Sequence, residues 1–268
     1  MYQDIAPHIY DNHYHPCPPS AGDIILGYED DQILMKEDGT FLHYEECRRE
    51  HSFQYLFAID QIHFYLSDLS EEDAMQKVSY RAMRTYEPSD LAFAAVTGWQ
   101  LYQWYRDQKY CGKCGEEMHP DTAERAMRCP KCGNLVYPKI MPAVIVGIRN
   151  EKGQILLTKY ANRPYTKFAL VAGFAEIGET IEETVKREVK EETDLDVTDL
   201  TFYKSQPWSF SSTLLFGFWA HADSHQPIIM DDGELKEAGW YDRDVNVDNL
   251  DQASLTAEMI RMYKKGRD

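Results

Sequence analysis

The residues with the clearest potential for chemistry form an acidic run between positions 173 and 195. Glu188, Glu191 and Glu192 stand at positions i, i+3 and i+4, so in a helix their carboxylates emerge side by side. Mutual repulsion destabilises such a helix unless cations lie between the carboxylates. Oxygen ligands of this kind suit Mg²⁺ or Mn²⁺, which bind phosphate oxygens at the same time. The spacing therefore indicates metal-assisted attack on phosphorus, and an ordinary solvated acidic helix is the alternative.

Two cysteine pairs form a second group of potential ligands. Cys111 and Cys114 are separated by fourteen residues from Cys129 and Cys132. Each pair can place two thiolates on one tetrahedral zinc ion, and nearby glycines fit turns whose backbone amides point at the sulfur atoms. Because cysteine fills all four positions, no coordination site is left for water. The sequence thus predicts a structural Zn²⁺ in a reducing compartment.

The acidic run carries its own helix signals. Thr180 and Glu183 form a capping-box pair, and the apolar residues Ile181, Val185 and Val189 recur every four positions. This pattern predicts a helix of about three turns with one buried stripe and an acidic opposite face.

Strand-like runs on both sides of this helix must position it. Residues 143–148 and 154–158 predict a hairpin with a turn near Gly153. Later elements are predicted as strands at 201–204, 214–220 and 239–241 and as a helix at 254–265. Strands before and after helices indicate an α/β sandwich.

The first hundred residues predict a small mixed α/β domain. Strand-like runs occupy 24–26, 32–35 and 55–59, and apolar residues recur at helical spacing between Glu71 and Asp107. Within that stretch Ser89 and Asp90 form a helix start signal. We therefore expect three domains: a mixed N-terminal domain at 1–107, a zinc ribbon at 108–138 and a third domain at 139–268.

Composition limits the classes of function. With 28 basic and 45 acidic residues the formal charge is −17, so the surface repels phosphate and disfavours non-specific nucleic-acid binding. An anionic substrate must then bind through metal ions or in a local cationic pocket. The chain has no run of about 18 apolar residues and no leader pattern, so we expect a soluble cytoplasmic protein with no membrane partner.

The acidic run resembles the Nudix box, in which glycine is followed after five residues by Glu and after seven more by Arg-Glu-apolar-X-Glu-Glu. The matching positions are Gly173, Glu179, Arg187, Glu188, Val189, Glu191 and Glu192. This resemblance implies a Nudix α/β/α sandwich with a mixed sheet. It also implies Mg²⁺ or Mn²⁺ on the last three glutamates, with Glu179 and Arg187 in supporting roles.

A zinc ribbon before the box and the sequence Ser205-Gln206-Pro207-Trp208 after it resemble the NADH pyrophosphatase group, over residues 99–240. Members hydrolyse NADH to nicotinamide mononucleotide and AMP, and some remove NAD caps from RNA. The resemblance also implies a homodimer. A Nudix pyrophosphatase for another nucleoside diphosphate such as ADP-ribose is the runner-up, and a non-catalytic nucleotide-sensing module is the alternative from another class.

Further site residues follow from the resemblance by matching position. The backbone carbonyl of Ala172 and the side chain of Glu234 join the metal site, with Glu237 as the alternative. Either Glu191 or Glu234 is the general base. Substrate contacts map to Tyr137 and Phe174, for which core packing is the alternative, and to a loop of eight residues: Gln206, Pro207, Trp208, Ser209, Phe210, Ser211, Ser212 and Thr213.

The chain departs from the family pattern at three positions. Asp194 replaces a glycine at the helix end, where a left-handed conformation is expected that Asp tolerates better than most residues. Ser209 and Ser211 replace loop prolines. Because proline pre-orders a loop, we expect their absence to loosen substrate binding, and restored prolines to improve it.

Overall fold

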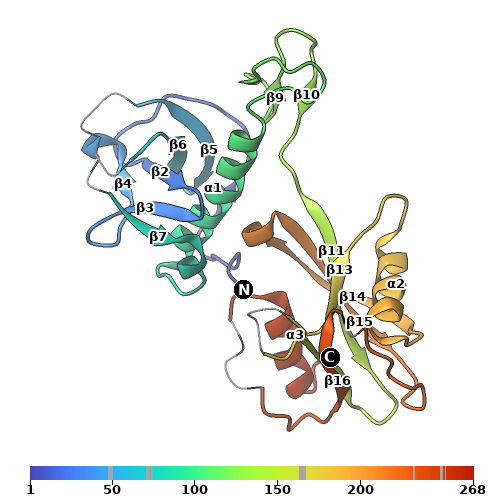
Figure 1. Ribbon diagram of the computed structural model, residues 1–268. Coiled ribbons are helices and arrows are strands. Elements are labelled where there is room, and N and C mark those ends of the chain that lie inside the picture. Colours follow the sequence, from blue (N-terminus) through green and yellow to red (C-terminus); the bar gives the residue numbers. More distant parts are fainter. Residues whose placement is uncertain are drawn as a thin grey trace. The chain divides into compact units, whose positions relative to one another are not determined.

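The computed structural model divides into two compact units (Figure 1). The N-terminal unit comprises Tyr2–Lys139 and Ser209–Ser211, and the C-terminal unit comprises Met1, Ile140–Trp208 and Ser212–Asp268. The structure describes residues 1–47, 51–70, 73, 75–162, 167–231, 233–247, 250 and 252–268. The cysteine segment lies within the N-terminal unit, and the expected division into three domains stays a prediction.

A mixed sheet organises the N-terminal unit. Its strands lie in the order β1-β5-β6-β2-β3-β7, with β4 paired to β2. Strands β2 and β6 are parallel and the other pairs are antiparallel. The bounds are β1 Tyr10–Asp11, β2 Ile24–Glu29, β3 Gln32–Lys36, β4 Leu42–His43, β5 Phe53–Ile59, β6 Ile62–Ser67 and β7 Met75–Ser79. The strands predicted at 24–26, 32–35 and 55–59 are therefore confirmed.

The helical pattern assigned between Glu71 and Asp107 is wrong over its first part. Met75–Ser79 is strand β7, which pairs with β3, and Tyr80–Arg84 is a 3₁₀ helix. Five residues are too few for periodicity to separate a strand from a helix, so pairing with β3 decides. Residues 71, 72 and 74 lie outside the described residues.

Helix α1, Ser89–Asp107, begins at the predicted start signal and packs against the sheet. At Gly98 a Cβ atom would come within 2.4 Å of the Tyr28 hydroxyl and 2.7 Å of Leu26 Cδ1. The Tyr28 hydroxyl donates to the Ala95 carbonyl at 2.7 Å. Glycine therefore allows α1 to approach β2 this closely. In the part of the chain that the structure describes, no helix is both long and apolar enough to cross a bilayer.

The C-terminal unit is the expected α/β/α sandwich around a mixed sheet. The strand order is β14-β15-β11-β12-β16, with β13 paired to β11; β11 and β15 are parallel. Helices α2 and α3 lie on opposite sides of the sheet (Figure 1). The bounds are β11 Met141–Arg149, β12 Ile155–Tyr160, β13 Val171–Phe174, α2 Ile181–Thr193, β14 Thr198–Trp208, β15 Thr213–His221, β16 Leu235–Tyr241 and α3 Leu255–Lys264.

Strand β11 supplies apolar side chains to both layers of this sandwich. Val144 and Val146 belong to the core cluster under α2, with Val185 and Val189 of the helix. Ile145, between them in sequence, belongs to the cluster under α3. This alternation is the two-residue period of a strand that is buried on both faces.

A short hairpin connects β14 to β15. Trp208 is paired with Thr213, a 3₁₀ turn covers Ser209–Ser211, and Ser212 adopts a left-handed φ of 55°. The predicted loop from 206 to 213 is thus mostly strand and tight turn.

Gln206 joins this hairpin to helix α3. Its side chain is fully buried; the amide nitrogen donates to the Ala253 carbonyl at 2.9 Å and the oxygen accepts from the Leu255 amide at 2.7 Å. These bonds hold the backbone on both sides of Ser254, the N-cap residue of α3. Gln206 therefore has a structural function in the fold.

We expect Gln206→Ala to lower the free energy of unfolding by about 1–3 kcal/mol, because it leaves buried backbone groups without these partners. Urea unfolding measures the loss. Gln226→Ala is the matched control: Gln226 makes the same two kinds of bond to Asp196, at 3.1 and 2.8 Å, but in an exposed position. Equal losses in the two variants would contradict the buried, structural function of Gln206.

Candidate functional site

Helix α2 forms as its sequence predicts. The Thr180 hydroxyl accepts from the Glu183 amide at 3.2 Å, and the Glu183 carboxylate accepts from the Thr180 amide at 2.8 Å. Val185 and Val189 are fully buried. At the other end Asp194 adopts the expected left-handed conformation, with a φ of 57°. The cap, the buried stripe and the C-terminal residue together fix which face of α2 carries the acidic residues.

Arg187 connects this acidic face to the loop that precedes the helix. Its Nε and Nη2 donate to the two carboxylate oxygens of Glu179 at 2.5 and 3.0 Å, and Nη2 also donates to the Phe174 carbonyl at 2.8 Å. The guanidinium, together with the Glu176 amide, lowers the pKa of Glu179 to about 2. This forked ion pair holds the loop against α2 in a fixed orientation.

Arg187 also donates to the acidic face itself. Its Nη1 lies 2.8 Å from Glu188 Oε1 and 2.9 Å from Glu191 Oε2. One cation therefore relieves part of the repulsion between two neighbouring carboxylates.

The Glu188 carboxylate lies against the backbone of Gly173 in β13. A Cβ atom on Gly173 would come within 2.0 Å of Glu188 Cδ and Oε2. Burial raises the pKa of Glu188, although Arg187 opposes this shift. Glycine at 173 thus leaves the space that the Glu188 carboxylate occupies, and a nearby cation would stabilise its charged form.

The loop before β16 brings further carboxylates to the C-terminal end of α2. The amides of Ile229 and Asp231 donate to the carbonyls of Thr193 and Glu192 at 3.0 and 3.2 Å, and the Glu234 amide donates to the Asp231 carbonyl at 3.0 Å. These bonds satisfy helix-end carbonyls and fix the loop beside the helix.

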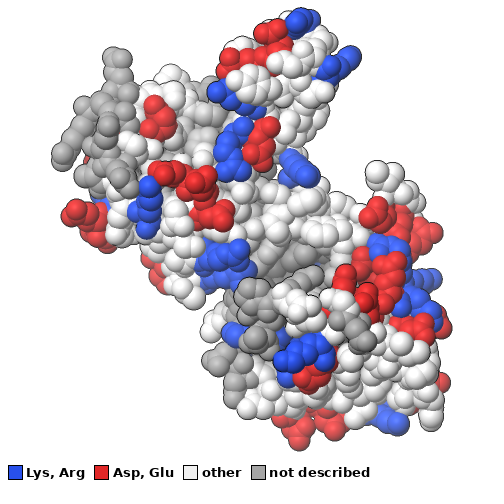
Figure 2. Space-filling model, viewed as in Figure 1, with Lys and Arg blue, Asp and Glu red and all other residues white. Residues whose placement is uncertain are grey.

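The result is a cavity of about 240 Å³ lined by five carboxylates: Glu188, Glu191, Glu192, Asp231 and Glu234. Asp and Glu side chains gather over α2, with Lys and Arg among them (Figure 2). Glu192 is buried, with 2% of its surface exposed. Four of the five were candidates from sequence, and Asp231 was missed; its only signal is its position in an acidic turn just before Glu234.

Glu237, the alternative to Glu234, does not line this cavity. Its carboxylate accepts from Lys159 Nζ at 2.7 Å and from the Tyr241 hydroxyl at 2.5 Å. The geometry therefore favours Glu234. Ala172 lies in β13, one residue before Gly173.

The predicted substrate residues lie in different surroundings. Phe174 is 50% exposed and follows Gly173 directly, whereas Tyr137 is 53% exposed and its hydroxyl donates to Glu124 at 2.7 Å. Neither ring is packed in a hydrophobic core.

The hairpin residues divide into exposed and buried ones. Pro207 and Ser211 are exposed, Trp208 and Ser212 are half-buried, and Ser209, Phe210 and Thr213 are buried. Within the N-terminal unit the Phe210 ring packs against Tyr2, with ring centroids 5.6 Å apart, and the Ser209 amide donates to the Tyr2 hydroxyl at 3.1 Å. Proline at 209 would remove this hydrogen bond, so the expected benefit of a restored proline does not apply there.

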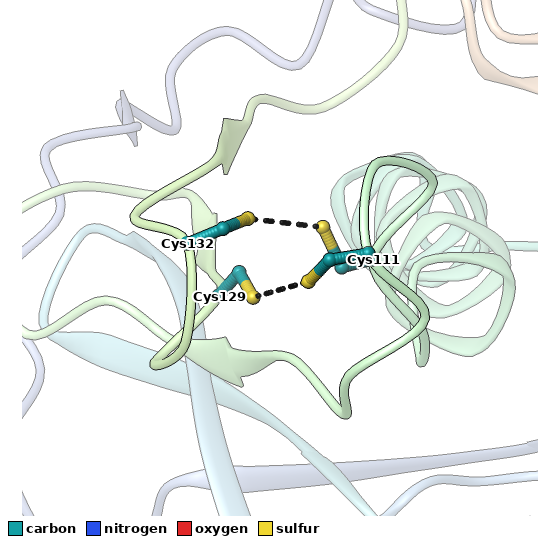
Figure 3. A group of neighbouring side chains, drawn as sticks. Cys111, Cys129 and Cys132 are labelled. Atoms are coloured by element: carbon teal, nitrogen blue, oxygen red, sulfur yellow. Dashed lines mark hydrogen bonds between the residues drawn. The ribbon is translucent and has the colours of Figure 1, made fainter.

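The four ribbon cysteines converge in the N-terminal unit (Figure 3). Cys111 and Cys132 sulfurs are 3.7 Å apart, and Cys114 and Cys129 sulfurs are 3.5 Å apart. A tetrahedral zinc with bonds of about 2.3 Å places its sulfurs about 3.8 Å apart. The spacing of the thiols therefore fits zinc.

Backbone amides favour the charged form of two of these thiols, Cys111 and Cys129. The Lys113 amide lowers the pKa of Cys111 to about 6, and the Cys132 amide lowers the pKa of Cys129. Gly115 and Gly133 adopt left-handed φ values of 75° and 70° in the two turns. Three two-residue strands, β8 His119–Pro120, β9 Met127–Arg128 and β10 Leu135–Val136, complete the ribbon.

Comparison with known proteins matches two segments of the chain. Residues 139–263 match the family model described as NUDIX domain, and residues 106–137 match the model described as NADH pyrophosphatase zinc ribbon domain. The first match contains the residues that line the carboxylate cavity, and the second contains the four ribbon cysteines.

Curated relatives named NAD-capped RNA hydrolase NudC, from Salmonella typhi and from Escherichia coli strain SMS-3-5, are 44% identical over 147 residues. The match covers 55% of this chain and 56% of each relative, so the chain spans about half the length of the curated relatives it matches. Among solved structures, a NUDIX hydrolase from Nitrosomonas europaea is 27% identical, with a TM-score of 0.46, covering 59% of this chain and 91% of that chain.

Chelator-washed protein should retain about one zinc per chain, because four thiolates bind zinc far better than carboxylates bind Mg²⁺. Cys114→Ser should lose this zinc and unfold the ribbon, since the ribbon has little core of its own. Elemental analysis and thermal unfolding measure both effects, with Cys17→Ser, at an exposed cysteine outside the ribbon, as control. Well-folded wild-type protein without zinc would refute the assignment.

Gly173→Ala should displace the Glu188 carboxylate and weaken Mn²⁺ binding by about 10-fold or more, as changes beside metal ligands commonly do. The melting temperature of the metal-free protein should change little, because only the end of a flexible side chain moves. Electron paramagnetic resonance of free Mn²⁺ measures the affinity. Gly112→Ala, where a Cβ meets nothing within 4 Å, is the control; unaltered Mn²⁺ affinity in Gly173→Ala would count against this site.

Proposed function

This chain carries a Nudix domain preceded by the zinc ribbon of NADH pyrophosphatases, and from that premise we propose that it hydrolyses the diphosphate of NADH with the help of divalent cations. The products are the reduced nicotinamide mononucleotide and AMP; NAD and the NAD cap of an RNA offer the same diphosphate. The observation that carries the proposal is the cavity where five carboxylates meet beside α2. The name of the Salmonella typhi and Escherichia coli relatives supports NAD-capped RNA among the substrates.

The donors of the cavity fit Mg²⁺ or Mn²⁺. All are oxygens, and Gly173 leaves room for one of them. We assign the ions to the side chains of Glu188, Glu191, Glu192 and Glu234 and to the carbonyl of Ala172. Bound ions lower the pKa of an attacking water and neutralise charge on the diphosphate. The zinc of the ribbon is structural in this proposal.

The chain's own groups move the proton and orient the site. Glu191 and Glu234 are both exposed at the cavity, and whichever of them does not hold an ion can accept the proton of the attacking water. Arg187 keeps Glu188 and Glu191 in place through its two bonds from Nη1. The fixed positions of these groups reduce the reorganisation that the reaction requires.

Substrate recognition is assigned to exposed rings and to the hairpin. Phe174 presents a half-exposed ring one residue after Gly173, and its carbonyl is held by Arg187. Such a ring can stack on nicotinamide or adenine. By the resemblance we also assign Tyr137 and residues 206–213 to substrate contacts, and the buried Gln206 acts there by positioning the hairpin.

Two parts of the proposal go beyond what the carboxylate cavity itself supports. One is a homodimer, which sedimentation measures directly. The other is the preference for a nicotinamide dinucleotide over ADP-ribose, the substrate of the runner-up function. ADP-ribose carries the same diphosphate, so the carboxylate cavity serves both reactions.

Chromatography of the products from NADH, NAD, NAD-capped RNA and ADP-ribose, with Mg²⁺ or Mn²⁺, tests the function. We expect a higher kcat/KM for NADH than for ADP-ribose and no turnover in EDTA. Glu192→Gln should lower kcat by about two or more orders of magnitude with the fold intact, since a ligand charge is lost. Glu182→Gln, on an exposed residue of the same helix, should leave kcat unchanged.

The outcomes separate the alternatives. Preference for ADP-ribose would overturn the NADH assignment and keep the metal-dependent pyrophosphatase. Binding of nucleotides without turnover of any substrate would identify a sensing module instead. Full activity in Glu192→Gln would refute the carboxylate cavity as the active site.

A further inference from the structure

Asp231 lines the carboxylate cavity although it is not among the site residues predicted from sequence. Its backbone is tied to α2, because its amide donates to the Glu192 carbonyl at 3.2 Å. Its own carbonyl accepts from the amides of Glu234 and Leu235 at 3.0 and 2.8 Å. Asp231 is thus fixed between one cavity glutamate on the helix, Glu192, and another just before β16, Glu234.

The Asp231 side chain is oriented by a turn. Its Oδ1 accepts from the Gly233 amide at 2.8 Å. Within the described ranges no donor binds the other carboxylate oxygen, Oδ2. One oxygen therefore fixes the plane of the carboxylate, and the other is left for a ligand in the cavity that this residue lines.

Among the described residues, the contacts of Arg187 offset only part of the negative charge of the cavity. Five carboxylates line it, and the nearby Arg187 donates to only two of them while it also binds both oxygens of Glu179. A diphosphate brings further negative charge. A divalent cation in such a cavity would offset this negative charge.

We propose that Asp231 is a further ligand of the divalent cations in this site, acting from the loop side together with Glu234. This inference rests on the proposed function, in that it takes the cavity as the place where the cations bind. A short, pre-oriented Asp side chain on a loop whose backbone is held by the ligand helix is a suitable oxygen donor for Mg²⁺ or Mn²⁺.

Asp231→Asn tests the proposal with little change of fold, because the Asn oxygen can still accept from the Gly233 amide while the charge is lost. Titration of the full-length, zinc-containing protein with Mn²⁺, followed by electron paramagnetic resonance, gives the number and affinity of bound ions. We expect one Mn²⁺ fewer per chain, or affinity weaker by about 10-fold or more. The stabilisation of the melting temperature by Mn²⁺ should fall in parallel.

Two further variants separate a ligand from a turn former. Asp38→Asn is the matched control, since Asp38 Oδ1 accepts from the Thr40 amide at 3.0 Å in the same kind of turn in the N-terminal unit; its Mn²⁺ titration should equal that of the wild type. Asp231→Ala removes both the charge and the turn. If Asp231→Asn binds Mn²⁺ like the wild type and only Asp231→Ala is impaired, Asp231 is a turn former and the proposal is overturned.

The same titration distinguishes this inference from the proposed function. A wild-type protein that binds Mn²⁺ through Asp231 but splits no dinucleotide refutes the function and keeps the ligand. A wild-type protein that hydrolyses NADH, with wild-type Mn²⁺ binding in Asp231→Asn, refutes the ligand and keeps the function.

Discussion

Repulsion between carboxylates in one small cavity is the constraint on which the C-terminal unit depends. Helix α2 presents three glutamates on one face, and a loop adds two more acidic residues. Such a face is stable only if the helix is fixed by other means. The capping box, the buried valines and the forked contact of Arg187 with Glu179 supply those means. The unit thus holds a cluster of negative charges that, in the proposed function, cations complete.

The zinc ribbon also brings several ligand groups of like charge together, but its donors are sulfur atoms. Its thiols are brought together by two turns, and backbone amides already favour the charged form of Cys111 and Cys129. Four sulfur ligands fill the coordination sphere of a tetrahedral zinc and leave no position for water. The expected zinc ion therefore stabilises the fold. At the cavity, oxygen donors on a helix and a loop leave coordination positions for phosphate. In the proposed function, donor chemistry therefore assigns zinc to the fold and the divalent cations to the reaction.

Local sequence patterns predicted much of this arrangement, because several of its parts are decided within a few residues. The cap at Thr180, the left-handed Asp194 and the cysteine turns are of this kind. Long-range contacts were not predictable. The place of Asp231 depends on bonds to the end of α2, and the burial of Gln206 depends on α3. Strand β7 likewise forms through pairing with β3, which its own five residues do not encode.

The division of the chain into units has a consequence for how its parts can be recombined. Ser209–Ser211 belong to the N-terminal unit, although the strands on both sides belong to the other. A fragment that starts at residue 140 would carry Phe210 without Tyr2, the ring it packs against, and would expose an apolar side chain to water. A chimaera that exchanges the C-terminal unit between relatives must therefore take Ser209–Ser211 and Tyr2 from the same parent, because Phe210 packs against Tyr2.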